Sequence, residues 1–212
     1  IADYDDPKIQ RALSKVDLPI VGCGGSYQDQ SQYPNVPYVA TDNYALVNHA
    51  FEHLKQKGIE NFAFYGLPHD EEHRWAIERE RGIIKICKDN GFECAVFRGQ
   101  KTRPDTWHYN MDRLAEWIQT LPTPIGIVAV TDARARHVVQ VCDKIGRLVP
   151  DQVSIVGIDD DDIARNLSRV SLSSVSQGCF DIGFQAARLL HKRIERFYTQ
   201  QKPLNSGKLP RV

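Results

Sequence analysis

The segment SIVGIDDDDIAR, Ser154–Arg165, runs from an apolar strand directly into four consecutive aspartates. Its first half is apolar and rich in branched side chains, which is typical of a strand buried on both faces of a parallel sheet. A run of carboxylates in a loop is ordinarily solvated surface. In an open α/β sheet, however, ligands bind just beyond the carboxyl ends of the strands. The segment therefore predicts a buried strand with a candidate polar site at its end.

Outward from this segment, short β-branched runs alternate with amphipathic helical stretches. Runs that predict strands begin near residues 19, 37, 61, 94, 125, 153 and 170, and helices are expected at 43–57, about 71–90, 107–119, 133–145 and about 177–197. In two of these helices the apolar residues recur at i, i+3, i+4 and i+7; they are Val47, Ala50, Phe51 and Leu54, then Ala135, Val138, Val139 and Cys142. Helices between buried strands imply right-handed βαβ units and a parallel sheet covered on both faces.

The composition bounds the class of protein. The 212 residues are 42% hydrophobic, enough to bury the core of one or two domains. Lysine plus arginine and aspartate plus glutamate both total 27, so the net charge is zero. A neutral chain lacks the positive field that holds a phosphate backbone. Any DNA-binding element is expected to lie outside this chain.

Cysteine use and hydropathy bear on location. Five scattered cysteines form no CxxC pair, and their odd number leaves at least one free thiol, which favours a reducing cytoplasm. No run approaches the roughly 20 apolar residues that span a bilayer, so no membrane association is expected. The chain begins IADYDD without an initiator methionine, which predicts that residue 1 is not the natural start.

Polar side chains collect where predicted strands end. Asp132 follows the strand near 125–130, and Asp159 follows the next strand. Neighbouring carboxylates suit a polyol, because each offers two oxygens to adjacent sugar hydroxyls in charge-assisted hydrogen bonds. The early turns of the helix near 71–90 face the same side and carry Trp75 and Arg79. Arg79 could donate bidentate hydrogen bonds to vicinal hydroxyls, and Trp75 either covers a sugar ring or belongs to the core.

Three more specific motifs, for calcium, zinc and nucleotides, are not supported by the residues of the chain. A calcium-binding EF-hand loop beginning at Asp159 would need glycine and glutamate where the chain has Ala164 and Val170. The pattern HAFEH places His49 and His53 off the apolar face of its helix, so surface histidines are expected rather than a zinc site. The glycines GCGG, residues 22–25, lack a full nucleotide-binding fingerprint, and a tight turn at the lip of a cleft is expected. No metal, no cofactor and no catalytic nucleophile is predicted.

The ordered motifs carry a resemblance. The chain reads, in order, ATDNYALVNHAFEHLKQKGI, NFAFYG, ERERG, GIVAVTDARA, VSIVGIDDD and LSSVSQ. This order resembles the effector domain of the lactose-repressor family of sugar-responsive regulators. The segments VGCGGSY, FAFYGLP, RWAIERE and VTDARARHVVQVC are similar to the members that respond to xylose, in which the sugar domain precedes a DNA-binding domain of the arabinose-regulator type. The resemblance implies D-xylose as ligand, a homodimer, and DNA contact only through a domain absent from this chain.

The resemblance also implies site residues. The arginine that binds sugar hydroxyls in the family corresponds to Arg79, three residues before Gly82. The polar pair after the VAV strand corresponds to Thr131 and Asp132, with threonine where the family usually has asparagine. The first aspartate of the GxDD element corresponds to Asp159. Asp161 and Asp162 are expected to be ordinary solvated charge.

The fold implied by the resemblance is periplasmic-binding-protein-like, with two doubly wound parallel-sheet lobes joined by three hinge crossovers. They are expected near residues 40–43, near 173–177 and near Lys208, with Thr41, Asp42 and Ser174 as hinge residues and Gln177 either serving the hinge or lining the pocket. Residues 42–175 would form the C-terminal lobe, and residues 1–41 and 176–212 a partial N-terminal lobe. Relative to the family pattern, about sixty leading residues with a βαβ unit are missing.

The function predicted from the sequence is sugar sensing in a transcriptional regulator. A sugar held between the lobes would shift the hinge population and so alter DNA binding. Two other classes stay open at this point. One is a periplasmic sugar-binding protein of a transporter, which shares the two-lobed plan and would be preceded by a secretory signal. The other is an enzyme that uses the same aspartates as acid and base.

Overall fold

A computed structural model describes residues 1–4, 6–27, 29–70, 73–167 and 169–201. Its strands form two parallel sheets. The small sheet has the order β1 (Ala2–Asp3), β2 (Gly22–Gly25) and β3 (Tyr38–Thr41). The large sheet has the order β5 (Cys94–Arg98), β4 (Phe62–Gly66), β6 (Ile125–Ala129), β7 (Val153–Asp159) and β8 (Ser173–Ser176). The predicted α/β fold with two parallel-sheet lobes is confirmed.

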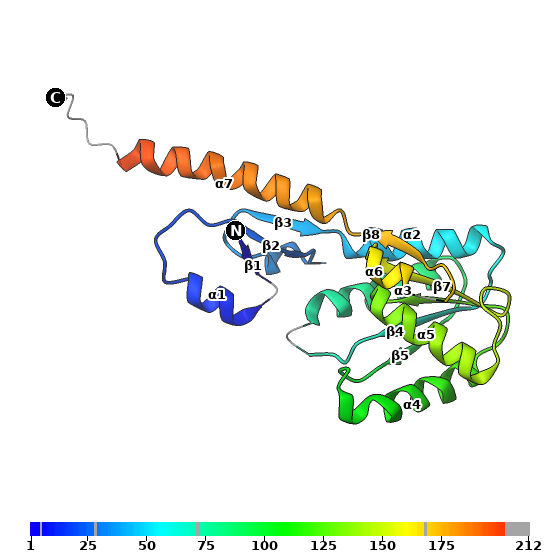
Figure 1. Cartoon of the computed structure of the whole chain (residues 1–212). Helices are drawn as coiled ribbons and strands as arrows, with labels where there is room; N and C mark the ends of the chain where they lie inside the picture. The colour runs from blue at the N-terminus through cyan, green and yellow to red at the C-terminus, as the bar shows by residue number, and fades with distance from the viewer. Residues whose placement is uncertain (5, 28, 71–72, 168, 202–212) are drawn as a thin grey trace, which may run out of the picture.

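Each sheet is accompanied by helices. The large lobe carries α2 (Asn43–Gln56), α3 (Arg74–Asp89), α4 (Trp107–Thr120), α5 (Asp132–Ile145) and the short α6 (Asp162–Asn166). The small lobe carries α1 (Pro7–Leu13) and α7 (Cys179–Gln201), which run on opposite sides of its sheet (Figure 1). Turns of 3-10 helix also lie at Gln30–Gln32 and Pro104–Thr106. None of the described helices combines the length and apolarity that crossing a membrane requires.

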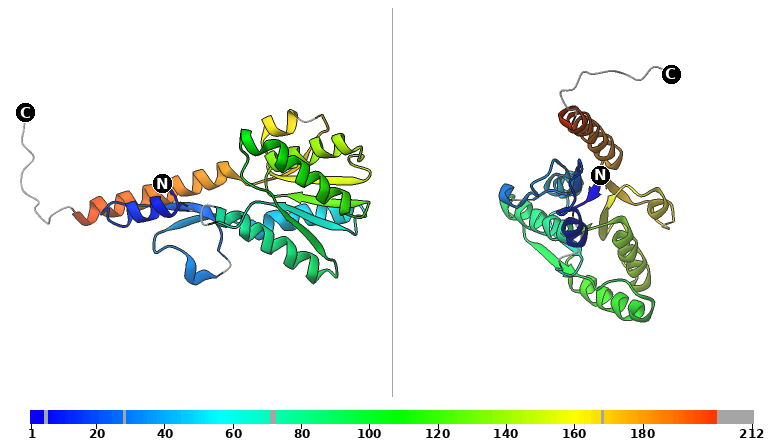
Figure 2. Two further views of the ribbon diagram at one scale, coloured as in Figure 1. Left: turned by 90° about the horizontal axis from the view of Figure 1, so that it is seen from below. Right: turned by 90° about the vertical axis from the view of Figure 1, so that its left-hand side faces the viewer.

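The core of the large lobe has two layers, one on each face of the sheet. One layer is built from α2 and α3 against side chains such as Phe64 and Val156, and the other from α4 and α5 against side chains such as Ile127 and Ile155. Both sets of periodic apolar residues predicted for the helices at 43–57 and 133–145 are buried. Figure 2 shows this sheet enclosed by helices, with α7 extending away from it. The helical period thus determines which face of each helix meets the sheet.

The strand order of the large sheet locates its ligand edge. Along the chain, β5 pairs on the outer side of β4, and the next strand, β6, pairs on the inner side. This reversal is a topological switch point, and in open α/β sheets ligands bind there, beyond the carboxyl ends of the strands. Val130 and Thr131, which follow β6, lie at that edge.

Several elements differ from the sequence-based expectations. The segment GCGG forms strand β2 between β1 and β3, so the tight turn expected at these glycines is wrong, while the strand predicted over residues 19–24 is confirmed in its second half. The short elements β1, α1 and α6 carry too little apolar periodicity to be predicted, and α1 buries no residue. The expected start of α3 at Glu71 and the expected crossover near Lys208 lie outside the described residues.

A histidine is partly enclosed in the layer between α4 and α5. His137 lies edge-on to the ring of Trp107, with its Nδ1 atom 3.4 Å from the hydroxyl of Tyr65. Burial, together with the nearby guanidinium groups of Arg134 and Arg136, lowers the pKa of His137 to about 4. The imidazole is therefore neutral in the folded chain over most of the acidic range.

We predict that His137 makes the fold acid-sensitive. Unfolded, the imidazole takes up a proton near its ordinary pKa of 6.5, whereas folded it does so only near 4. The contribution of the neutral His137 to the free energy of unfolding is therefore present above pH 6.5 and is lost as the pH falls toward 4. The free energy of unfolding should fall by at most about 3 kcal/mol over this range. Chemical denaturation of the wild type and of His137→Leu at pH 8, 6 and 4 measures it. A wild-type loss no larger than that of the variant would contradict the assignment.

Candidate ligand-binding site

A cavity of about 460 Å³ lies between the two lobes, at the carboxyl ends of their strands. This volume falls within the roughly 300–1,000 Å³ of small-molecule pockets. Five of the six residues predicted to bind ligand line it: Trp75, Arg79, Thr131, Asp159 and Gln177. The small lobe and the connections contribute Ile1, Ala2, Asp3, Cys23, Gly24, Gly25, Thr41, Asn43 and Ile182.

Arg79 is the most enclosed charge in the cavity wall. Only 2% of the residue is exposed. Its Nη1 donates to the carbonyl of Val130 at 2.6 Å, and its Nε donates to Oδ1 of Asn43 at 3.1 Å. The guanidinium lies 4.6 Å from the ring centroid of Trp75, one turn earlier on α3. Since two elements hold the guanidinium, its orientation toward the cavity is set before any ligand arrives.

Asn43 belongs to the same group and was missed by sequence reasoning. It is the first residue of α2 and is 1% exposed. Its Oδ1 is occupied by Arg79, and among the described residues its Nδ2 finds no hydrogen-bond acceptor. A buried donor without a partner is costly, which makes it a candidate to donate to a ligand oxygen. The available signal was its position directly after a strand end, where polar residues gather in such sheets.

Gly25 leaves the space that Asn43 occupies. A Cβ at Gly25 would lie 2.6 Å from Nδ2 of Asn43, closer than side chains tolerate. This close approach explains the glycine at the end of β2. The glycine segment therefore helps to build the cavity wall, in place of the turn expected from the sequence.

Asp159 supplies the carboxylate at the cavity. Its Oδ1 accepts a hydrogen bond from Nε2 of Gln177 and lies 3.9 Å from Nη1 of Arg79. Burial raises the pKa of Asp159, while Arg79 and Gln177 oppose that rise. The backbone at Asp159 has a φ of 140°, and the next residue, Asp160, has a φ of 59°. Such conformations are unfavourable for residues with a side chain and concentrate at functional sites.

Asp132 occupies a different place from the other predicted ligand residues. It is fully buried and is not among the described residues that line the cavity. Its Oδ1 accepts from the hydroxyl of Ser174 at 2.6 Å, and its Oδ2 accepts from the backbone N–H of Asp161 at 2.9 Å. Asp132 thus holds the turn that presents Asp159. A direct contact between Asp132 and a ligand stays a prediction.

The rest of the aspartate run faces solvent. Asp161 and Asp162 are both exposed, as expected. Asp161 has a further role, because its carboxylate accepts from the backbone N–H of Ala164 at 2.8 Å and caps α6. Asp160 pairs with Arg165. The run therefore divides into one aspartate at the cavity and three that shape or flank the turn.

The residues predicted for the hinge lie close to the passages of the chain between the sheets. Thr41 ends β3, and Asp42 caps α2 by accepting from the N–H of Ala45 at 2.9 Å. Ser174 lies inside β8, and the chain leaves the large sheet only after Ser176, through Gln177 and Gly178. The hinge role of Thr41, Asp42 and Ser174 stays a prediction.

The structure also bears on the metal sites considered from the sequence and on other cavities. His49 and His53 are both exposed on α2, as expected. Within the described ranges, no three side chains of histidine, cysteine, aspartate or glutamate are grouped to hold a metal ion. Another cavity, of about 360 Å³, is lined by residues of α5 such as Arg136 and Val139 and by residues near Arg169. It contains none of the predicted ligand residues.

A two-lobed α/β fold with a cavity between the lobes, at the carboxyl ends of the strands, is the architecture of periplasmic-binding-protein-like domains. The chain belongs to this family: residues 51–208 match the periplasmic binding protein-like domain. Residues 1–44 match a second description, the XylR N-terminal domain.

Similarity to individual proteins is more informative than the match to the family. The chain is similar to the xylose operon regulatory protein of Escherichia coli strain K12, with 49% identity over 100% of this chain and 53% of the relative. It is 42% identical to the protein of the same name from Haemophilus influenzae, over 96% of this chain and 53% of the relative. A solved structure described as the xylose-binding transcription activator xylR matches with a TM-score of 0.86 and 48% identity, over 100% of this chain and 53% of that one. The chain thus spans about half the length of these relatives.

We predict that the turn bearing Asp159 depends on Gly157. A Cβ at Gly157 would lie 2.0 Å from Oδ1 of Asp132, so Gly157→Ala must displace that buried carboxylate. We expect a loss of about 1–3 kcal/mol in the free energy of unfolding, as for other overpacked sites. Gly183→Ala is the matched control, because a Cβ there meets nothing within 4 Å. Chemical denaturation compares them, and equal stability of the two variants would contradict the role given to Asp132.

Proposed function

We propose that this chain is the sugar-sensing domain of a bacterial transcriptional regulator and that D-xylose is its effector. The observation that carries the proposal is the convergence of Arg79, Asn43 and Asp159 on one cavity between the lobes. The 49% identity to a xylose operon regulatory protein supports this reading and the choice of sugar.

The polar groups of the cavity are complementary to a polyol. Arg79 and the unpartnered amide nitrogen of Asn43 are donors, and the carboxylate of Asp159 is an acceptor. A sugar hydroxyl both donates and accepts, so adjacent hydroxyls can satisfy both kinds of group. Trp75 adds an aromatic surface that can cover the apolar face of a sugar ring.

The two-lobed arrangement supplies the signalling mechanism. Cavity residues come from both lobes, so a sugar in contact with both binds the closed form more tightly than the open form. That difference in affinity shifts the hinge population toward closure. The changed orientation of the lobes then alters how DNA-binding domains outside this chain meet their half-sites. A homodimer acting in the cytoplasm is part of the proposal.

The other two classes receive less support. The relatives are named as regulators, which favours a regulator over a periplasmic sugar-binding protein of a transporter. It also favours a non-enzymatic role. In the cavity, the carboxylate of Asp159 is engaged by Gln177, an arrangement suited to binding.

Calorimetric titration of the full-length protein that contains this chain tests the proposal. D-xylose, L-arabinose, D-ribose and D-glucose are compared, and D-xylose is expected to bind most tightly. Asp159→Asn keeps the shape but removes the charge and should weaken xylose binding at least about tenfold, since a charge-assisted hydrogen bond is worth roughly 1.5–3 kcal/mol. Asp162→Asn, in the exposed part of the run, is the matched control and should bind as the wild type does.

The same titration, repeated at several pH values, tests the role of the Asp159 carboxylate. Because burial raises the pKa of Asp159, its carboxylate takes up a proton at a higher pH than an ordinary aspartate. Sugar hydroxyls donate to the ionised form, so affinity should fall as the pH decreases through this raised pKa. Asp159→Asn should not show this fall in affinity, because its side chain does not titrate. Absence of heat with all four sugars from a folded protein would rule out the proposed ligand.

A further inference from the structure

Arg74 begins α3 at an electrostatically unfavourable place. The amino terminus of a helix carries partial positive charge, which stabilises anions and destabilises cations. Arg74 is the first residue of α3, and the preceding cap position, His73, makes no side-chain capping hydrogen bond. A guanidinium at this position does not stabilise the helix, so its contacts elsewhere are informative.

Those contacts reach the small lobe. Nη1 of Arg74 donates to the carbonyl of Ser26 at 2.7 Å, and Nη2 donates to the carbonyl of Gly25 at 2.7 Å. The guanidinium also stacks on the ring of Tyr27, 3.6 Å from its centroid. One planar group thus contacts three consecutive residues at the end of β2 by hydrogen bonds and by a cation–π interaction.

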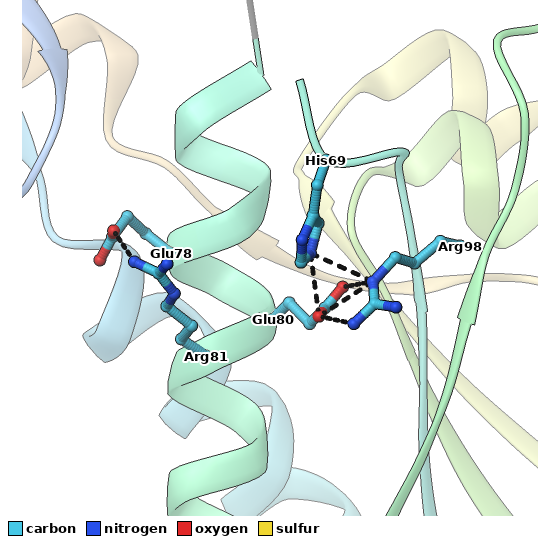
Figure 3. A network of polar contacts seen from close by, with 5 residues as sticks. All are labelled: His69, Glu78, Glu80, Arg81 and Arg98. Atoms are coloured by element: carbon cyan, nitrogen blue, oxygen red, sulfur yellow. Dashed lines mark hydrogen bonds and ion pairs between the residues drawn. The ribbon is translucent and has the colours of Figure 1, made fainter. Parts of the chain in front are cut away.

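The helix that carries Arg74 is fixed to the large lobe. On α3, the buried side chain of Glu80 receives hydrogen bonds from Arg98 at the end of β5, the shortest at 2.6 Å, and lies 3.0 Å from His69 (Figure 3). Tyr27 belongs to the small lobe, where its ring lies 4.9 Å from that of Tyr33. The contacts of Arg74 with residues 25–27 therefore cross from one lobe to the other.

The crossing lies at the wall of the cavity. Gly25 and Trp75, the residues next to Ser26 and Arg74, both line it. A Cβ at Gly25 would lie 3.1 Å from Cβ of Trp75, so the two lobes are in close approach at this point. Separation of the lobes would break the contacts of Arg74 while leaving Arg79 within the large lobe.

We propose that Arg74 is a closing latch, a positioning residue that holds the lobes together over the sugar cavity and so sets the affinity for the effector. The inference rests on the proposed sugar-sensing function and assigns a regulatory residue to the same site. Arg74 acts through the closed population: if that population falls to one tenth, the apparent affinity falls about tenfold.

The test uses the full-length protein with Arg74→Ala and Arg74→Lys. Without sugar, small-angle X-ray scattering should give a larger radius of gyration for Arg74→Ala than for the wild type. Calorimetry should give a D-xylose dissociation constant at least about tenfold higher. Arg74→Lys keeps the charge but loses the fork and the stacking surface, so it should lie between them. Denaturation curves establish that each variant is folded.

Arg81→Ala is the matched control, because Arg81 lies on the same helix but pairs with Glu78 of α3 itself (Figure 3). It should change neither the radius nor the affinity. Tyr27→Leu removes the stacking partner from the other lobe, and its combination with Arg74→Ala should weaken binding by less than the product of the single effects.

The two proposals fail in different ways. If the wild type binds no sugar, the sensing function is wrong. The radius of gyration of Arg74→Ala compared with that of the wild type still tests whether Arg74 holds the lobes together. If the wild type binds D-xylose while Arg74→Ala matches it in radius and affinity, the latch is wrong and the sensing function stands.

Discussion

The buried guanidinium of Arg79 is the interaction on which the site depends. A charge removed from water is costly unless its donors are satisfied, so the surrounding groups must be arranged around it. The carbonyl of Val130 at the end of β6 and the amide oxygen of Asn43 at the start of α2 meet that requirement. In doing so they tie α2, α3 and the central strand together at the switch point. The amide nitrogen of Asn43 is left without an acceptor among the described residues, and Asn43 lines the cavity.

The turn that carries Asp159, beside Arg79 in the cavity wall, adopts a locally unfavourable structure. Asp159 and Asp160 adopt positive φ angles, and burial raises the pKa of Asp159. Both features cost folding free energy, because an ordinary aspartate would ionise more easily and adopt a common backbone conformation. The surrounding contacts hold the turn in place: Asp132 accepts from the N–H of Asp161 and from Ser174, and Gln177 donates to Asp159. Sites that expose a carboxylate to a ligand commonly show this exchange of stability for function.

Much of this arrangement could be predicted from the sequence, because the parallel α/β plan and the helix faces follow from hydrophobic period alone. The same plan directs attention to strand ends, which pointed to Asp159 and to Arg79 on the helix that faces them, whereas Thr131 was predicted only from the family resemblance. Asn43 was missed because its role depends on which atom of a distant arginine it meets, a fact that no local pattern contains. Asp132 was predicted to bind the ligand because it follows a strand end, a position that does not reveal which way a side chain points, and that contact stays a prediction. A tight turn was expected at the glycines of residues 22–25, even though the strand predicted from Pro19 extended to Gly24, because four small residues have no apolar alternation that marks a strand.

In the proposed complex, a sugar is held between the lobes by Arg79, Asn43 and Asp159. A crystal structure of the full-length protein grown with D-xylose tests it most directly. We expect sugar density in the cavity of about 460 Å³. Its hydroxyls should lie within hydrogen-bond distance of the Asp159 carboxylate, the Arg79 guanidinium and the amide nitrogen of Asn43. Density only at another position, such as the cavity lined by Arg136 and Arg169, would contradict sugar binding between the lobes.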